Sequence, residues 1–423
     1  MPTTLHQRRW QRHAVVITVS AAVAIAAAAC GSTGSGGSGG GTSNTAVKQV
    51  VVGVVTDFSG PQGILGTQEF DAYKLAADEI NAAGGIKSLG GAKIVLKKFD
   101  TQTDPAQGPV QASAAVADHV NVIIGGEVSD TVVGGTNVSH RAGIPWISIG
   151  AEASEITSRG FNDVFQSTST TGQIAKTYYD LLTSVASDLH VGHIRAAISV
   201  SDTTYGTELD QGFTTANKTM QVVNRFEYPL TTTDFSSVAA RMLHGSPNLL
   251  LNEGYPTDGV ALAKLFASTF KPPSAVKVFF ATAEPQLLVA QLGKQADGML
   301  AGSGPSPAFK GMPQSFLTAN AAFKKAYGTD MLGVSPTAWE AFMFLKAALE
   351  KAGSVSGSAI AAALHKVKLT QAMGNIYPGA PQQFASNGSL VDPVQYYVQI
   401  QHGQMVGVYP PTIAAAAPIP YSP

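Results

Sequence analysis

The stretch VVVGVVTDFSGPQGILG, residues 50–66, decides the fold. Its first six residues are valines interrupted only by Gly53, and such a continuous apolar run is typical of a strand buried on both faces of a parallel sheet. A turn follows at 59–61, and apolar residues then recur at 70, 73, 77 and 80 before Gly84-Gly85. Spacings of three and four predict an amphipathic helix that ends at the glycines. The stretch therefore predicts the first strand–turn–helix unit of an α/β protein.

The same alternation of strand and helix continues along the chain. Buried runs predict strands at 94–99, 122–124, 146–149, 196–200, 222–226, 248–251, 276–280 and 299–301, with helices at 104–119, 131–141, 172–189, 205–218, 235–244 and 259–270. Alternating elements with short connections specify parallel sheets that carry helices on both faces. The chain is longer than one core accommodates, so we expect two sheets in two lobes.

One late segment predicts a hairpin. Phe384, the pair Asn387-Gly388 and the apolar run 394–400 follow one another. Asn-Gly supplies the two positive φ angles of a tight primed turn. We expect this strand pair to complete the sheet of one lobe.

The N-terminal residues indicate export from the cytoplasm. Arg8, Arg9 and Arg12 precede the uncharged apolar run 14–29, which ends at Cys30, the only cysteine of the chain. A basic start, a short apolar run and small residues before a cut site are typical of a signal peptide. The run is shorter than the roughly 20 apolar residues of a membrane span, which disfavours a permanent transmembrane helix.

Cys30 follows three alanines and resembles the cysteine of a bacterial lipobox, which carries lipid after cleavage, although Ala27 stands where leucine is more common. Residues 31–45 contain only Gly, Ser, Thr and Asn, a composition typical of a flexible tether. We therefore predict a signal peptide at 1–29 and a lipidated cysteine with its tether at 30–45. Two alternatives stay open: an ordinary signal peptide with an unmodified cysteine, and a tethering helix that is never cut.

Composition excludes several classes of function. The formal charge is −1, with 27 basic and 28 acidic residues, so bulk electrostatics does not favour nucleic acid as a partner. His190 and His193 form the nearest histidine pair and have no acidic or cysteine partner beside them, so we expect no metal site. No Walker sequence and no Gly-x-Gly-x-x-Gly follows a strand, and no nucleophile–base pair is evident. We therefore expect that the protein has no cofactor and is not an enzyme.

Several motifs in order resemble one known family. They are VVVGVVTDFSGPQGILG at 50–66, DAYKLAADEINAAGGI at 71–86, FDTQTDPAQGPV at 99–110, RAGIPWISIGAEASEIT at 141–157, DTTYGTEL at 202–209, TTTDFSSVAARM at 231–242 and FASNGSLVDPVQYYVQI at 384–400. The chain is similar, from Val47 to about Gln401, to type I periplasmic solute-binding proteins of the leucine/isoleucine/valine class.

The resemblance implies an α/β fold of two doubly wound lobes joined by three crossover strands. By that pattern the first lobe is 46–166 plus 303–369, and the second is 167–302 plus 370–423. It further implies a monomeric, non-enzymatic protein at the outer face of the cytoplasmic membrane that binds a small polar solute and delivers it to an ABC permease. A lipoprotein that senses the ligand and signals to a membrane partner is the alternative.

Physical reasoning and the resemblance indicate the same site. The carboxyl ends of parallel strands face a crevice, and the loops at those ends are 56–66, 125–130, 149–153, 201–206, 252–258 and 281–285. The resemblance implies ligand contacts at Ser59 and Leu65 in the first loop. It implies that Ser129 and the loop residues Gly150, Ala151 and Glu152 bind the carboxylate of a ligand. It further implies that the Tyr205 ring covers the ligand and that Thr257 or Asp258 pairs with its ammonium group. A serine before a helix or a Tyr-Gly pair also occurs as a plain cap or turn.

Three acidic residues change the ligand argument. Glu152 stands where relatives place a hydroxyl, and Glu127 and Asp130 flank Ser129. Carboxylates in a low-dielectric cleft repel an anionic group. One hypothesis is therefore a cationic ligand, or a neutral ligand rich in hydrogen-bond donors such as an amide, amine or polyol. The other is that these acids point outward to solvent and the ligand is an ordinary amino acid.

Overall fold

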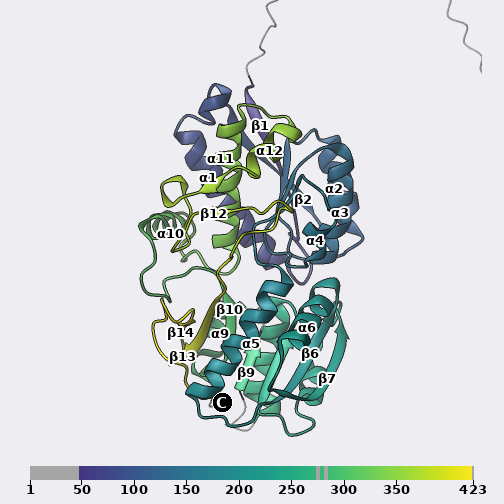
Figure 1. The fold of residues 1–423 in the computed structure, drawn as a ribbon, viewed down its shortest axis with the longest axis vertical. Coiled ribbons are helices and arrows are strands. Elements are labelled where there is room, and N and C mark those ends of the chain that lie inside the picture. The colour runs from purple at the N-terminus through teal and green to yellow at the C-terminus, as the bar shows by residue number, and fades with distance from the viewer. Residues whose placement is uncertain (1–46, 273–276, 281–283, 422–423) are drawn as a thin grey trace, which may run out of the picture. The chain divides into compact units, whose positions relative to one another are not determined.

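The computed structural model describes residues 47–272, 277–280 and 284–421, within one compact unit that spans Ala46–Pro423 (Figure 1). The predicted signal peptide, Cys30 and the tether lie outside the described residues. Within the described part of the chain, no helix has the length and apolar character that a membrane span requires.

The first sheet contains five parallel strands in the order β2-β1-β3-β4-β5. They are β1 (Gln49–Thr56), β2 (Lys93–Asp100), β3 (Val122–Ile124), β4 (Trp146–Ser148) and β5 (Val164–Gln166). The valine run of β1 is buried in the middle of this sheet, as the sequence predicts. We call this sheet and the helices around it the first lobe.

Helices cover both faces of the first sheet (Figure 1). One face packs on α1 (Gly63–Ala82), α11 (Ser335–Ala352) and α12 (Gly357–Leu364), and the other on α2 (Gln107–Ala117) and α3 (Ser129–Ala142). The remaining elements of this lobe are η1 (Lys87–Leu89), α4 (Glu155–Ser158), α10 (Gln314–Tyr327), β11 (Lys368–Leu369), η4 (Gln371–Met373) and β12 (Gln382–Gln383). Burial of an apolar stripe on each helix against the sheet stabilises this arrangement.

The second sheet contains seven strands in the order β14-β13-β10-β9-β8-β6-β7. They are β6 (Arg195–Asp202), β7 (Gln221–Pro229), β8 (Leu249–Glu253), β9 (Lys277–Phe280), β10 (Leu300–Ser303), β13 (Tyr396–Gln401) and β14 (Gln404–Tyr409). The pairs among β6 to β10 are parallel, whereas β13 is antiparallel to both β10 and β14. We call this sheet and its helices the second lobe.

The second sheet is also covered on both faces. Helices α5 (Thr171–Asp188) and α6 (Thr204–Ala216) pack on one face, and α7 (Ser236–Met242) and α8 (Pro256–Leu265) on the other. The π-helical turn η2 (Phe266–Phe270) extends α8, and α9 (Pro285–Leu292) leads into η3 (Gly293–Ala296). Both lobes therefore have the doubly wound α/β architecture predicted from the alternation of strands and helices.

The chain passes between the two sheets three times. It crosses from β5 to α5, from β10 to α10, and from the segment after β12 to β13. The last crossing lies later than the split at 369/370 that the sequence suggested, because Ile376, Phe384 and Leu390 are buried in the core of the first lobe. The β11–β12 pair and the bridge between Gln166 and Ser389 hold this segment there.

The late hairpin forms at a different turn from the predicted one. The prediction at Asn387-Gly388 is wrong: Gly388 has a positive φ, but Asn387 does not, and the flanking residues form only an isolated bridge. The hairpin instead joins β13 to β14 through His402 and Gly403, with φ angles of 56° and 74°. Two successive positive φ angles match the twist of the strands. Of the predicted pair, only the run 394–400 completes a sheet, as β13, and its hairpin partner is β14 instead of the segment at Phe384.

Candidate ligand-binding site

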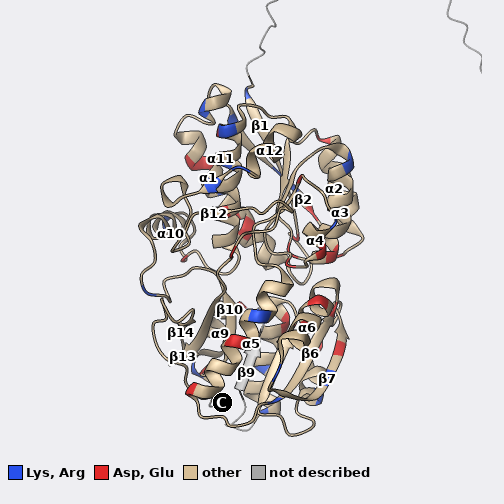
Figure 2. Ribbon diagram, viewed as in Figure 1, with Lys and Arg blue, Asp and Glu red and all other residues tan. Residues whose placement is uncertain are grey.

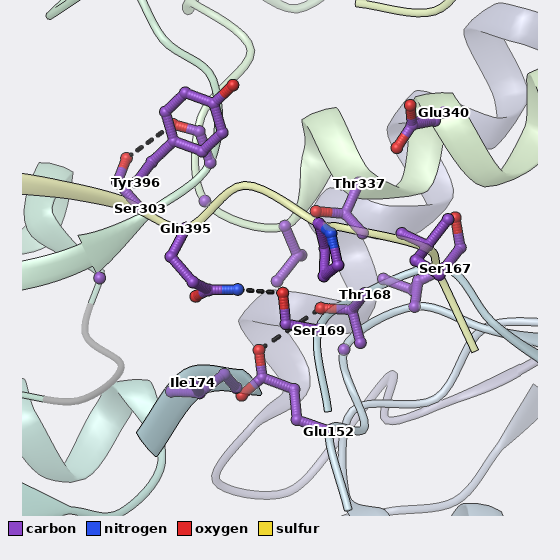
Figure 3. Close-up of a pocket in the computed structure, with 18 of the residues that line it drawn as sticks. Glu152, Ser167, Thr168, Ser169, Ile174, Ser303, Thr337, Glu340, Gln395 and Tyr396 are labelled. Atoms are coloured by element: carbon purple, nitrogen blue, oxygen red, sulfur yellow. Dashed lines mark hydrogen bonds between the residues drawn. The ribbon is translucent and has the colours of Figure 1, made fainter. Parts of the chain in front are cut away.

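A cavity with a volume of about 140 Å³ lies between the two lobes, at the carboxyl ends of their strands. A cavity of this volume holds several water molecules and is therefore large enough for a small-molecule ligand. Each of the predicted loops except 56–66 contributes a lining residue. The three crossing segments also line the cavity, and Figure 3 shows Gln395 of the third crossing bonded to Ser169 of the first.

Three of the predicted contact residues line this cavity: Gly150, Glu152 and Tyr205. A side chain at Gly150 would place its Cβ 2.0 Å from Oε2 of Glu127, so any other residue at this position would require the Glu127 carboxyl group to move. Glu152 accepts a hydrogen bond of 3.4 Å from the Thr168 hydroxyl (Figure 3). Two loops of the first lobe and one helix start of the second thus meet here, as expected for a crevice between parallel sheets.

Four other predicted residues lie outside the cavity lining and have structural partners in the first lobe. Ser129 is buried and accepts a hydrogen bond from the Ala153 N–H at 3.2 Å. The Ala151 carbonyl accepts one from the Gln166 amide at 2.9 Å. Leu65 is fully buried in α1, and Ser59 donates to Asp100 at 2.6 Å. Their direct contact with ligand stays a prediction.

Thr257 and Asp258 also lie outside the lining, at the start of α8. Asp258 accepts hydrogen bonds from the Tyr228 hydroxyl at 2.9 Å and from the Tyr255 N–H at 3.1 Å, the second of which completes a capping box. Thr257 accepts a hydrogen bond from the Gln62 amide at 2.7 Å, across the two lobes. The ammonium-pairing role of these two residues stays a prediction.

Polar contacts hold the lobes against each other around the cavity. The Glu208 carboxylate of α6 accepts from the N–H groups of Ser154 and Glu155 at 2.6 and 3.1 Å. The Thr204 hydroxyl, also of α6, donates to Asp130, so this acid pairs with the second lobe and does not line the cavity. The described lobes are therefore in contact, as in a closed cleft.

Two further acids line the cavity that were not among the predicted contact residues: Glu284 lies in the predicted loop 281–285, and Glu340 comes from a segment that the sequence did not indicate. Glu284, just before α9, is buried and accepts from the Gln68 amide at 3.1 Å. Glu340 lies in α11, is 1% exposed, and its Oε1 has no hydrogen-bond partner. The only sequence signal for Glu340 is an acid that stands within the apolar run from Ala338 to Leu345.

The cavity is acidic, with carboxyl groups of Glu127, Glu152, Glu284 and Glu340 in its wall. Among the described residues that line it, none is Lys, Arg or His. Figure 2 shows charges of both signs over both lobes, so the excess of acids is local to the cavity.

Burial controls the protonation of these acids. It raises the pKa of Glu152 to about 8 and that of Glu284 to about 7. Burial also raises the pKa of Glu340 well above its usual value, and burial together with the charge of Glu69 does the same for Glu127. Low dielectric disfavours the charged form, so burial favours the protonated form of these carboxyl groups.

Tyrosine rings complete the walls. Tyr205 and Tyr255 of the second lobe lie with ring centroids 5.6 Å apart, and Tyr377 and Tyr396 lie 5.7 Å apart. Within the described chain, no group of three His, Cys, Asp or Glu side chains is arranged to hold a metal ion. The arrangement offers hydrogen-bond acceptors and aromatic faces to a small molecule.

Comparison with known proteins agrees with this geometry. The family model described as periplasmic binding protein matches residues 49–404. The Leu/Ile/Val-binding protein homolog 7 of Brucella abortus is 26% identical over 381 residues, which cover 87% of this chain and 93% of that protein. Homolog 8 of the same species is 31% identical over 221 residues. This match covers 51% of the present chain and 54% of homolog 8, so the chain spans only about half the length of that relative.

Solved structures share the fold. LivJ of Streptococcus pneumoniae, in complex with isoleucine, has a TM-score of 0.72 at 18% identity, with 85% of this chain and 99% of that chain covered. A solute-binding protein of an ABC transporter from R. palustris, in complex with benzoate, has a TM-score of 0.73 at 18% identity, with 88% and 97% covered. The chain therefore belongs to the periplasmic binding protein family.

Proposed function

We propose that this protein is a lipid-anchored receptor outside the cytoplasmic membrane that captures a small polar solute between its lobes and delivers it to an ABC importer. The observation that carries the proposal is the cavity enclosed at the carboxyl ends of both sheets, with polar contacts between the lobes around it. A ligand that contacts both lobes binds the closed form better than the open form and therefore shifts the population toward it.

The proposed ligand is an amino acid or an amide- or amine-like compound. The relatives with bound isoleucine and benzoate support a ligand of this size. The acids Glu127 and Glu152 support a ligand that carries hydrogen-bond donors, because the described wall holds four carboxyl groups and no Lys, Arg or His.

Within the site, we propose that Gly150, Glu152 and Tyr205 contact the ligand directly. The remaining predicted residues support these contacts through the bonds described above: Ser129 and Ala151 fix the loop around Glu152, and Asp258 fixes Tyr255. Substitution of Glu152 by threonine tests the role of its carboxyl group, because unchanged ligand preference would contradict it.

The proposal is tested by a thermal-shift screen of the purified chain against amino acids, amides, amines, polyols and aromatic acids. A ligand that binds only the folded state raises the melting temperature by mass action. Uptake of the ligand that scores best is then measured in cells with and without the gene. Loss of uptake supports delivery to an importer, whereas intact uptake with loss of a transcriptional response favours the sensing alternative.

The lipid anchor is tested separately. Cys30→Ser removes the predicted attachment site, and the variant is expected to leave the membrane fraction and to lose incorporation of labelled fatty acid. Wild-type protein that is found only in the soluble fraction would contradict the anchor without affecting the proposed ligand binding.

A further inference from the structure

One part of the cavity wall combines a carboxyl group with aromatic rings. Thr337 and Glu340 lie three residues apart on α11 and therefore share a helix face. The Tyr377 hydroxyl lies 3.4 Å from Thr337 Oγ1, and the Tyr377 ring is 5.7 Å from that of Tyr396. We call these four residues, Thr337, Glu340, Tyr377 and Tyr396, the α11 corner; all four line the cavity.

Glu340 is the unusual member of this corner. Its side chain is 1% exposed, its Oε1 has no hydrogen-bond partner, and the Tyr396 hydroxyl is also buried without one. Leaving such groups unsatisfied costs folding free energy, and Glu340 is the only charged residue type among the buried residues of α11. The described residues of the wall supply no Lys, Arg or His to neutralise the carboxyl group.

An ammonium group would give Glu340 the partner that it lacks. Its positive charge would favour the ionised form of Glu340, whose proton passes to solvent on binding, and its N–H bonds can then donate to the Glu340 carboxylate and to the Thr337 hydroxyl oxygen on the same helix face. Its charge would also be attracted to the negative faces of the two tyrosine rings. A ligand carboxylate placed here would find no cationic side chain in the described wall.

We propose that the ligand is an organic ammonium ion without a carboxylate, and that its ammonium group occupies the α11 corner. This inference rests on the proposed function and names the ligand class for the same cavity. The other acids of the wall extend the preference, because Glu127 and Glu152 line the cavity with Glu340. An amino acid would gain at its ammonium but would place its carboxylate among these carboxyl groups.

Binding of five probes to the full chain, purified in detergent, tests the inference by calorimetry. The probes are butylamine, 1,4-diaminobutane, tetramethylammonium, leucine and benzoate. At least one of the three ammonium ions is expected to bind more tightly than leucine and benzoate. Glu340→Gln should weaken that binding by at least about thirty-fold, the lower end of the cost of removing one partner of a buried charge pair.

Two variants control for folding and for charge. Glu79→Gln changes an exposed acid of α1 in the same lobe and should leave affinity unchanged. Glu340→Asp keeps the charge and should retain more ammonium binding than Glu340→Gln. Melting of each ligand-free variant, followed by circular dichroism, shows whether it is folded.

The outcomes separate this inference from the proposed function. Binding of leucine or benzoate with no binding of the ammonium ions overturns the inference and leaves the proposed function standing. Ammonium binding that is equal in wild type and Glu340→Gln, or equally lost in Glu340→Gln and Glu340→Asp, also overturns it. If none of the five probes binds, the inference is wrong and the proposed function loses its support as well.

Discussion

The substitution Glu284→Gln should make the protein less sensitive to rising pH. Glu284 is 1% exposed at the cavity wall, and burial raises its pKa from 4.5 to about 7, although the Gln68 amide donates to it at 3.1 Å. A carboxyl group whose pKa is higher in the folded state stabilises that state at low pH. This stability is fully present below pH 4.5 and is lost as the pH rises through about 7.

The size of the effect follows from the shift. Each pKa unit corresponds to about 1.4 kcal/mol of folding free energy. The shift of the Glu284 pKa from 4.5 to about 7 therefore changes the free energy of unfolding by about 3 kcal/mol in total. Roughly 2 to 3 kcal/mol of this change falls between pH 5 and pH 8. The amide that replaces the Glu284 carboxyl group would be neutral at every pH, and the variant should lack this part of the dependence.

Urea unfolding of wild type and Glu284→Gln at pH 5 and pH 8, without ligand, measures the difference. The free energy of unfolding of the variant, relative to wild type, should rise by about 2 to 3 kcal/mol between the two pH values. Glu227→Gln, at an exposed carboxyl group of β7, is the matched control. A difference that stays constant with pH, or that falls, would refute the argument that burial dominates at Glu284.

Three further changes have defined outcomes. Gly150→Ala should displace the Glu127 carboxyl group, because the new Cβ would lie 2.0 Å from its Oε2, and the ligand-induced rise in melting temperature should shrink. Glu208→Gln weakens charge-assisted hydrogen bonds that join the lobes, so the ligand-free protein should show a larger radius of gyration in small-angle X-ray scattering; an unchanged radius would mean that other contacts hold the cleft. Phe342→Ala leaves a cavity at a fully buried site in the core of the first lobe and should lower the free energy of unfolding, measured by urea titration, by about 3–5 kcal/mol. Leu317→Ala, at a side chain that is 48% exposed, is the control and should change the free energy of unfolding by less than about 0.5 kcal/mol.

Much of the fold was predictable because local patterns specify it. The valine run of β1 and the three- and four-residue spacing in α1 define strand and helix without reference to distant residues. The late hairpin was misplaced because Asn-Gly is a strong local turn signal. In the structure Gly388 takes a positive φ beside a single bridge, and His402 adopts a left-handed conformation that no local signal indicated.

The candidate site was predictable only in part. The loops that follow β3, β4 and β6 were identified, and they bring Glu127, Glu152 and Tyr205 to the cavity. Their individual partners were not predictable: Asp130 turns to Thr204 across the lobes, and Asp258 turns to Tyr228. A loop position specifies which residues are near a crevice, but the side-chain partners depend on what the other lobe presents.

By itself, the sequence determined the α/β alternation and the place of the crevice, because continuous apolar runs form buried parallel strands and the carboxyl ends of such strands share one edge. Only the tertiary structure decided which charges meet there. Glu340 and Tyr377 come from segments far along the chain from Glu127, and the repeated passage between the sheets brings them into one wall. Contacts between such distant segments leave no trace in local periodicity, so the acidic character of this cavity is a property of the folded chain.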